Sequence, residues 1–471
     1  MDARRYEVGM VGLGVMGRNL LLNMADHGVP VAGYDKDPAQ VASLRREAEG
    51  RAVAAATTVE EFTATLAPPR AVLLLVPAGP PVDAVIGALL PHLAPGDLLV
   101  DAGNSWFKDT DLRAHALGGR RIGFLGMGVS GGEQGARHGP SLMPGGSPDA
   151  YARIRTVVEA VAARVDGEPC ATYLGPGSAG HYVKMVHNGI EYGLMQAIAE
   201  SYDLMRRGLG LSDDELCEVY DGWNRSELAC YLIEISARIF VQVDPRTGKR
   251  LVDVILDEAK QKGTGMWTSQ NAMELGTPVP TIDAAVTARA LSGLEPERVE
   301  ASRALAGPRP AGLGERAETL ASLRNALYAA MIITFAQGMA LLRRASDVYG
   351  YRLPLGEVAA IWRGGCIIRA ALLEKVRGAY RARPDLPNLL VDPALAREVM
   401  MRQQDLRTIV SRGAGVGIPV PALAASLAYF DGYRSAWLPA NLIQAQRDFF
   451  GAHTYERADA PGVFHTEWSH G

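Results

Sequence analysis

Cysteines are few in this sequence, and they stand far apart. The 471 residues contain four cysteines, and no two of them have the CxxC spacing that zinc sites and thiol redox sites use. This spacing excludes a disulfide framework and a zinc centre, and no cluster of acidic residues suggests a site for another metal ion. We therefore expect a protein without a metal ion, in a reducing and cytoplasmic setting.

An excess of charge of one sign is also missing. Lysine and arginine together number 48 and aspartate and glutamate 52, so the formal net charge is −4. This balance gives no reason to expect a nucleic acid or an anionic membrane as a partner. The first residues also lack the long apolar segment and the cleavage site of a signal peptide.

One long run without charge does occur, at residues 325–342, and it has about the length of a membrane span. The run contains Asn325 and Gln337, and two arginines follow it directly. We expect it to be the buried central helix of a large helical domain rather than a membrane anchor.

The first part of the chain alternates short apolar runs with helical patterns. The runs are rich in valine, leucine and isoleucine and end in glycine, aspartate, asparagine or serine: residues 6–14, 29–35, 71–77, 97–104 and 122–130. Fully apolar strands separated by helices predict a parallel sheet covered on both faces. We expect an α/β domain of the doubly wound Rossmann type over residues 1–178.

Helical patterns dominate after the glycine-rich segment 175–183. They cover residues 181–209, 212–243, 251–261, 318–347, 355–380 and 393–413. We expect a large all-α domain over residues 179–434, with a Pro/Gly/Arg-rich surface loop at 294–314. Residues 435–471 would form a C-terminal helix and a short tail, which is aromatic enough to pack on its own domain or on a second subunit.

A glycine motif follows the first predicted strand. Gly12, Gly14 and Gly17 give the GxGxxG pattern, and Asp35 ends the next predicted strand at the usual distance. The glycines permit a tight turn, close approach of a pyrophosphate and close packing of helix on strand, while the helix N-terminus faces the phosphates. The sequence therefore predicts dinucleotide binding, with Leu13, Val15 and Met16 in the same loop.

The residues after the second strand bear on which cofactor is used. The Asp35 carboxylate can accept hydrogen bonds from both ribose hydroxyls and repels a 2′-phosphate. Asp37 adds to that repulsion, whereas Lys36 would attract the phosphate. We predict NAD, with NADP or the use of both cofactors as the alternative.

Four polar residues lie along one face of an otherwise apolar helix. They are Lys184, His187, Asn188 and Glu191, at positions i, i+3, i+4 and i+7. One interpretation is a buried ion pair between Lys184 and Glu191 with His187 satisfied nearby. The other is a catalytic stripe.

Further polar residues stand where turns are predicted. Asn104 ends a strand at the edge where α/β sheets bind ligands. The Ser130-Gly131-Gly132 turn offers backbone N–H groups and a hydroxyl to an oxyanion. For isolated cations such as Arg289, a surface salt bridge is the simpler interpretation.

Together these motifs resemble those of the decarboxylating 6-phosphogluconate dehydrogenases of the pentose phosphate pathway. The resemblance runs from GLGVMGRNL through VSGGEQGAR, KMVHNGIEYG, QKGTG and QRDFFGAHTYE to FHTEWS, nearly the full length. The shorter β-hydroxyacid dehydrogenases share the glycine loop and the helix lysine, but they lack the long helical domain. The resemblance implies oxidation and decarboxylation of 6-phosphogluconate to ribulose 5-phosphate and CO2, with hydride transfer to a nicotinamide cofactor.

The resemblance also implies roles for single residues. Lys184 would be the general base and Glu191 the general acid. The substrate would be held at its carboxylate and hydroxyls by Asn104, Ser130, Gly131, Gly132, His187 and Asn188, and at its phosphate by Tyr192, Lys262, Arg289 and Arg447, with His453 closing the site. In the family the tail with Arg447 and His453 comes from the neighbouring subunit, which implies a homodimer with shared active sites.

Two departures from the family pattern lie in the cofactor loops. Members that use NADP typically have Asn-Arg-Thr where this chain has Asp35-Lys36-Asp37. They also have a lysine where Pro77 stands in the loop formed by Val76, Pro77, Ala78 and Gly79, a loop expected to contact the cofactor together with Asn104. Both changes favour NAD. A third difference is Met266, where lysine is common.

Two further functions remain open from the sequence. One is a dehydrogenase of an unphosphorylated hydroxy acid, which the cations at the expected phosphate site disfavour. The other is an inactive module that binds a nucleotide or a sugar phosphate, which the intact pair of Lys184 and Glu191 disfavours.

Overall fold

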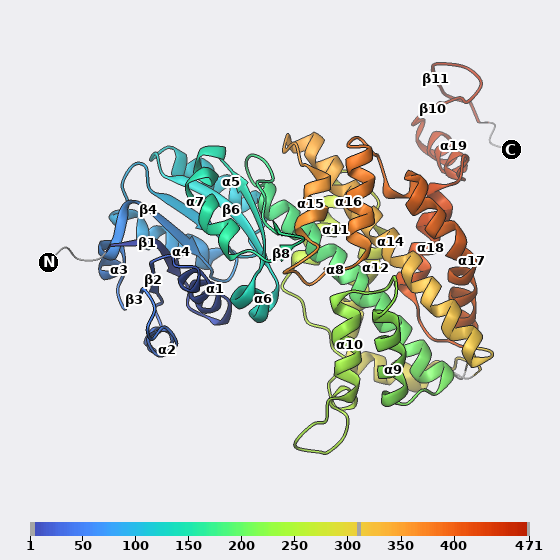
Figure 1. The fold of residues 1–471 in the computed structure, drawn as a ribbon. Coiled ribbons are helices and arrows are strands. Elements are labelled where there is room, and N and C mark those ends of the chain that lie inside the picture. The colour runs from blue at the N-terminus through green and yellow to red at the C-terminus, as the bar shows by residue number, and fades with distance from the viewer. Residues whose placement is uncertain (1–4, 309–311, 469–471) are drawn as a thin grey trace. The chain divides into compact units, whose positions relative to one another are not determined.

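The chain folds into two compact units, which are described separately. The computed structural model describes residues 5–308 and 312–468. The first unit extends as far as Ser426, and the second begins at Leu427. In the first unit a sheet with flanking helices is followed by a large helical region (Figure 1).

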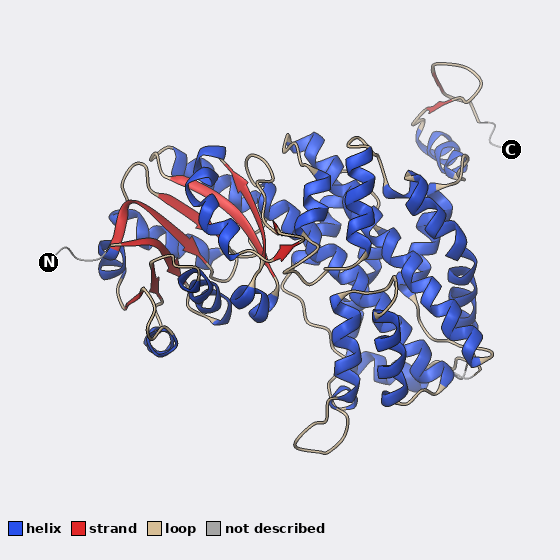
Figure 2. Cartoon of the chain, in the orientation of Figure 1, coloured by secondary structure: helices blue, strands red, loops and turns tan. Residues whose placement is uncertain are grey.

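A seven-stranded sheet organises the N-terminal part of the first unit (Figure 2). Its strands are β1 (Tyr6–Val11), β2 (Val31–Tyr34), β3 (Val53–Ala56), β4 (Leu66–Leu74), β5 (Leu98–Asp101), β6 (Gly123–Ser130) and β7 (Ser141–Gly146). The order is β3-β2-β1-β4-β5-β6-β7, parallel throughout except for β7, which is antiparallel to β6. The chain leaves β1 towards β2 and returns to β4 on the other side of β1. The carboxyl ends of β1 and β4 therefore form the switch point where such sheets bind ligands.

Both faces of the sheet are covered, as the apolar strands predict. Successive strand residues point to opposite faces, so Met10 packs with Leu20 in one apolar cluster and Val11 packs with Phe62 in the other. The covering helices are α1 (Val15–Asp26), α2 (Pro38–Glu47), α3 (Val59–Thr65), α4 (Pro80–Leu89), α5 (Phe107–Gly118), α6 (Gly132–His138) and α7 (Pro148–Val161). The expected doubly wound α/β fold is confirmed.

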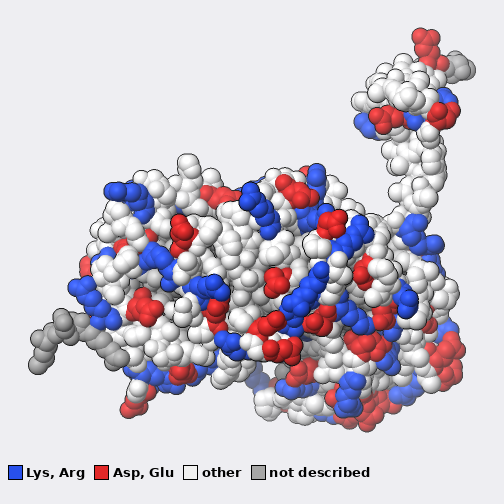
Figure 3. Space-filling view, turned by 45° about the horizontal axis from the view of Figure 1, so that its top comes forward, with Lys and Arg blue, Asp and Glu red and all other residues white. Residues whose placement is uncertain are grey.

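The helical region begins directly after the sheet and its helices. A two-strand hairpin, β8 (Arg164–Val165) and β9 (Glu168–Pro169), precedes it. The helices are α8 (Ala179–Asp203), α9 (Asp213–Asn224), α10 (Tyr231–Val241), α11 (Thr264–Glu274), α12 (Pro280–Ser292), α13 (Glu295–Ala304), α14 (Arg316–Tyr349), α15 (Leu355–Ile361), α16 (Leu372–Ala382), α17 (Pro393–Gly415) and α18 (Pro421–Tyr433). The expected all-α region after the α/β fold is confirmed. On the face shown in Figure 3, basic and acidic side chains are interspersed.

The charge-free run at 325–342 lies within α14. This helix is long and apolar enough to cross a membrane, but 89% of its 18-residue apolar window is buried inside the fold. Its side chains contact α8 and α17, and Gln337 is buried with a hydrogen bond to Thr281. The prediction of a buried central helix is confirmed.

Several predicted helical patterns are wrong in extent. The pattern 212–243 is two helices, and between them Asn224 accepts a hydrogen bond from the Cys230 backbone N–H at 3.1 Å. The pattern 355–380 is also two helices, because Gly365 has a φ of +65° between them. Of the pattern 251–261, only Leu251–Asp253 forms a short 3₁₀ turn. Apolar periodicity marks a buried face, but it does not reveal where the backbone leaves the helix.

Three other elements were not predicted. The expected loop at 294–314 contains the exposed helix α13, while residues 309–311 lie outside the described residues. Strand β3 consists of one valine and three alanines, which is a weak strand signal. Strand β7 contains Pro144 and two glycines, residues that usually argue against a strand, and it lies at the edge of the sheet, where they are tolerated.

The second unit contains α19 (Ala440–Gly451) and a small hairpin of β10 (Tyr455–Glu456) and β11 (Val463–Phe464). Asp448 of α19 is fully buried and accepts hydrogen bonds from the backbone N–H groups of Thr454 and Thr466 and from the indole N–H of Trp468. Burial raises the pKa of Asp448, but these bonds and the one with His465 outweigh it and hold the pKa at about 2. The aromatic tail thus folds back on its own helix.

Candidate active site

The polar stripe predicted from the sequence lies on α8, which packs against strands β6 and β7 and helices α11, α12 and α14. Lys184 is 5% exposed and His187 is fully buried. The ion pair that Glu191 makes is with His187, with 3.8 Å between Oε2 and Nδ1. The interpretation of a direct Lys184–Glu191 ion pair is therefore wrong, and the catalytic interpretation stands.

Gly128 lets the sheet approach the catalytic helix closely. A Cβ atom built on this glycine of β6 would lie 2.3 Å from Cβ of Lys184 and 2.8 Å from its Cγ. Only a residue without a side chain fits there, so the Lys184 stem lies directly on the backbone of β6. This contact fixes the start of the lysine side chain and removes water from around it.

The stripe has shifted protonation equilibria with identifiable causes. Burial lowers the pKa of the Lys184 ammonium, and the nearby Glu191 and Cys366 oppose this shift. Burial raises the pKa of the Glu191 carboxyl, against the charges of Lys184 and Arg289. The pKa of His187 is far below its usual value because of burial and the neighbouring Lys184. A lysine that loses its proton readily and a carboxyl that keeps its proton suit a base and an acid.

His187 connects the stripe to the turn after β6. Its Nε2 lies 3.3 Å from the Ser130 hydroxyl, and its Nδ1 lies 3.0 Å from the Asn188 side-chain oxygen. Asn188 in turn donates to the Thr264 hydroxyl at 3.1 Å. The predicted group of Ser130, His187 and Asn188 is thus brought together in space, although its members come from segments 57 residues apart.

The remaining two residues of that turn are shaped by backbone packing. Gly131 has a φ of +126°, and a Cβ there would lie 2.5 Å from the carbonyl oxygen of Gly365. Gly132 begins α6 with a φ of +62°. Both positions require glycine, and the turn therefore presents its backbone without side chains.

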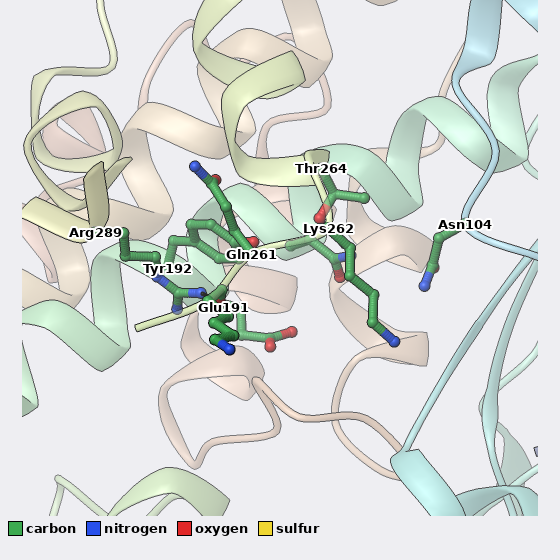
Figure 4. A pocket seen from close by; sticks show the side chains of 9 residues that line it. Asn104, Glu191, Tyr192, Gln261, Lys262, Thr264 and Arg289 are labelled. Carbon is green, nitrogen blue, oxygen red and sulfur yellow. Dashed lines mark hydrogen bonds between the residues drawn. The ribbon is translucent and has the colours of Figure 1, made fainter. Parts of the chain in front are cut away.

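A pocket of about 260 Å³ opens beside α8 (Figure 4). Its lining residues come from α8, α12, the segment before α11 and the turn after β5: Asn104, Asn188, Glu191, Tyr192, Lys260, Gln261, Lys262, Thr264 and Arg289. Six of these were predicted substrate or catalytic residues, which therefore share one cavity. Lys260, Gln261 and Thr264 were missed; their position next to Lys262 in a glycine-containing loop was the available signal.

Arg289 is held at one end of this pocket by an aromatic ring. Its guanidinium carbon lies 3.5 Å from the ring centroid of Tyr192, and Nη1 donates to the Lys260 carbonyl at 3.4 Å. Such stacking orients the planar cation while leaving its edge able to bind an anion. The simpler interpretation of Arg289 as one partner of a surface salt bridge does not fit this geometry.

A second groove, of about 720 Å³, lies at the switch point of the sheet. It is lined by the glycine loop, the end of β2, the turn after β4 and one face of α4: Val11, Gly12, Gly14, Tyr34, Asp35, Lys36, Val59, Leu75, Val76, Pro77, Pro80, Pro81, Ala84, Val85, Ala88 and Leu89. A Cβ on Gly17 would lie 1.8 Å from the Gly12 carbonyl oxygen, so helix and loop pack as a dinucleotide site requires. The residues present fit a dinucleotide.

Asp35 has a second function that the sequence did not reveal. Its Oδ2 accepts a hydrogen bond from the Leu13 backbone N–H at 2.7 Å, and its Oδ1 accepts one from the Asp37 N–H at 2.9 Å. Asp37 itself caps α2 by accepting from the Ala39 N–H. Leu13 points into the core, whereas Val15 is 49% exposed and Met16 is partly buried.

The other predicted cofactor residues follow β4 and β5. Val76 and Pro77 line the groove, and Ala78 and Gly79 complete the turn into α4. Asn104 lines the substrate-side pocket instead. Arg447 and His453 lie in the second unit, where Arg447 bonds to Gln444 and His453 contacts the ring of Phe450. Their relation to the pocket is not part of the described structure of either unit.

The fold and the site define a class of protein. A doubly wound sheet carries a dinucleotide groove, and the next helix carries a buried lysine and a carboxyl beside a cationic pocket. This is the arrangement of a nicotinamide-dependent oxidoreductase that acts on an acidic substrate.

Comparison with known proteins specifies the family. Residues 7–175 match the NAD binding domain of 6-phosphogluconate dehydrogenase, and residues 180–468 match the 6-phosphogluconate dehydrogenase C-terminal domain. A Bacillus subtilis protein named 6-phosphogluconate dehydrogenase, NADP(+)-dependent, decarboxylating, is 51% identical over 98% of this chain and 99% of its own length. The decarboxylating 6-phosphogluconate dehydrogenase of Escherichia coli is 48% identical over the same shares.

A solved structure agrees with these sequences. The Plasmodium falciparum 6-phosphogluconate dehydrogenase, studied with NADP+ and with 6-phosphogluconate, superposes with a TM-score of 0.93 at 43% identity, covering 98% of this chain and all of that one. The chain belongs to the 6-phosphogluconate dehydrogenase family.

Proposed function

We propose that this protein oxidises and decarboxylates 6-phosphogluconate to ribulose 5-phosphate and CO2. The observation that carries the proposal is the pair on α8, where burial lowers the pKa of Lys184 and raises that of Glu191 beside a pocket with cations. The relatives named for this reaction share about half of their residues with the chain over nearly its full length.

In the proposed reaction, Lys184 begins as the base. Its neutral amine takes the proton of the C3 hydroxyl, while the nicotinamide ring, when bound, accepts the hydride from C3. The resulting ketone lies β to the carboxylate. Lys184, now an ammonium, polarises the ketone oxygen, so that the electrons of the breaking C–C bond move onto that oxygen as CO2 leaves.

Glu191 completes the reaction as the acid. Loss of CO2 leaves an enediol, and the protonated carboxyl of Glu191 delivers a proton to C1. Two residues at i and i+7 on a helix are separated by about 10 Å along its axis. They can therefore lie on either side of a sugar acid without neutralising each other.

The two ends of the substrate require different partners. Asn104, Ser130, His187 and Asn188, with the glycine turn, would hold the carboxylate and hydroxyls. Tyr192, Lys262 and Arg289 would hold the phosphate, because the guanidinium stacked on Tyr192 presents an oriented cation. Arg447 and His453 would complete this end from a neighbouring subunit, so we propose a homodimer. Size measurement in solution by light scattering tests it, and a monomer at working concentration would exclude it.

Two arguments on the cofactor point in different directions. The names of the relatives refer to NADP, and they support the alternative of NADP or dual use better than the preference for NAD. The preference for NAD rests on this chain alone, because Asp35 lines the groove where a 2′-phosphate would lie. Lys36 lines the same groove and can serve NADP. Initial rates with each cofactor, followed by the absorbance of the reduced nicotinamide, decide between them.

The reaction itself is tested by assaying CO2 and ribulose 5-phosphate from 6-phosphogluconate, with gluconate as the comparison substrate. The proposal expects both products from the phosphorylated acid and a far lower rate with gluconate. Equal rates would favour a dehydrogenase of unphosphorylated acids, and binding without turnover would favour an inactive module. A cytoplasmic location is also proposed, because all four cysteines are free thiols.

A further inference from the structure

Arg113 is a buried arginine that joins two turns at the ligand-binding edge of the sheet. Its side chain on α5 is 7% exposed. Nε and Nη2 donate to the two carboxylate oxygens of Asp83 at 2.7 and 3.0 Å. Nη2 also donates to the Gly79 carbonyl at 3.1 Å, and Nη1 donates to the Ser105 hydroxyl at 3.3 Å and to the Asp101 carboxylate at 3.5 Å. One guanidinium thus connects the β4–α4 turn to the β5–α5 turn.

The first of these turns forms a wall of the dinucleotide groove. Gly79 is the last residue before α4, and Asp83 lies in the first turn of that helix. The opposite face of α4 lines the groove through Pro80 and Ala84, among others. The contacts of Arg113 therefore fix this wall from behind, without touching the groove.

The second turn presents Asn104 to the substrate-side pocket. The Asp101 carboxylate accepts hydrogen bonds from the Gly103 N–H at 3.0 Å and from the Ser105 hydroxyl at 2.6 Å, on either side of Asn104. Asp101 is fully buried, and Arg113 supplies the nearby positive charge. The turn that carries Asn104 is thus held in shape by a charged network that ends on Arg113.

The same turn is also attached to the helical region. Trp106 stacks on Trp267 of α11 with 5.9 Å between ring centroids and 13° between planes. Lys108 pairs with Glu274 at 3.0 Å. Because the turn is fixed to α11 on one side and to α4 through Arg113 on the other, it sets how the groove and the pocket lie relative to each other.

We propose that Arg113 is a positioning residue that aligns the bound dinucleotide with the substrate. The inference rests on the proposed function for its substrate half, while its cofactor half requires only dinucleotide binding. The planar fork of an arginine is needed, because a lysine carries the same charge but cannot bond both Asp83 oxygens, Gly79 and Ser105 at once.

The test uses two conservative variants and one control in the full-length protein. Arg113→Lys keeps the charge and loses the fork, and we expect KM for cofactor and for 6-phosphogluconate each to rise about tenfold, with a lower kcat. Asp83→Asn weakens only the groove side, so KM for the cofactor should rise about threefold while KM for 6-phosphogluconate stays nearly unchanged. Arg155→Gln removes an exposed arginine paired with Glu159 and should change neither constant.

Fluorescence titration with the reduced cofactor separates this inference from the proposed function. Weaker binding by Arg113→Lys than by Arg155→Gln supports the positioning role, even if 6-phosphogluconate is not the substrate. If Arg113→Lys lowers the melting temperature but leaves cofactor affinity and both KM values equal to those of Arg155→Gln, Arg113 is only structural and the proposal is overturned. If the unsubstituted protein does not oxidise 6-phosphogluconate, the proposed function fails, and the titration alone decides the cofactor half.

Discussion

The carboxylate of Asp35 accepts a hydrogen bond from the backbone N–H of Leu13, 22 residues earlier in the chain, at 2.7 Å. The residue expected to select the cofactor thus also holds the glycine loop that binds its pyrophosphate. Cofactor choice and loop geometry are therefore coupled in one side chain, and substitutions at Asp35 should affect both.

We expect Asp35→Asn to raise kcat/KM for NADP relative to NAD by about tenfold, because it removes a charge that repels the 2′-phosphate. Asp35→Ala should gain less, since losing the bond to Leu13 also costs about 1 kcal/mol of stability. Lys36→Ala is the opposing variant and should reduce the use of NADP. If Asp35→Asn leaves the ratio unchanged while Lys36→Ala removes activity with NADP, Lys36 controls the choice.

Lys184→Met should abolish turnover while substrate still binds. The variant replaces the base by an apolar side chain of similar length in a site that is already buried, so the fold should persist. A loss of about 10²- to 10⁴-fold in kcat is typical of removing a general base. Calorimetric titration with 6-phosphogluconate checks the binding. Substantial residual turnover in this variant would show that another group accepts the proton.

Catalysis should depend on pH in a bell-shaped manner, because Lys184 must be neutral and Glu191 protonated at the start of their steps. The rate rises as Lys184 loses its proton and falls as Glu191 loses its own, and the two apparent pKa values belong to the pair. Burial moves the two pKa values towards each other, lowering that of Lys184 and raising that of Glu191. In Glu191→Gln the fall at high pH should disappear along with most of the rate. A bell that persists in this variant would assign the alkaline limb to a different group.

Gly128→Ala should damage catalysis through the position of Lys184. The added methyl group would lie 2.3 Å from Cβ of Lys184, and overpacking of this kind costs about 1–3 kcal/mol. We expect a lower melting temperature and a kcat that falls more than KM rises. Gly378→Ala is the matched control, because no atom lies within 4 Å of a Cβ added there on α16. Equal effects of both substitutions on kcat would disprove the close contact.

Parts of the fold and of the site were predictable because their signals are local. The glycine loop, Asp35 at the end of the next strand and the spacing of Lys184 and Glu191 are each read within a few dozen residues. The apolar strands likewise indicated the parallel sheet. Where the signal was weak or mixed, as in the alanines of β3 or Pro144 in β7, the prediction missed the strand.

The sequence by itself determined the elements, the family and the residues able to act as base and acid, since periodicity and motifs depend on neighbours along the chain. The tertiary structure decided which of them meet. It placed Gly128 against Lys184, Ser130 against His187, and Arg113 between two turns. These contacts join segments far apart in sequence, and their geometry follows from how whole elements pack. For the same reason only the folded chain produces the burial that shifts the pKa values of Lys184 and Glu191.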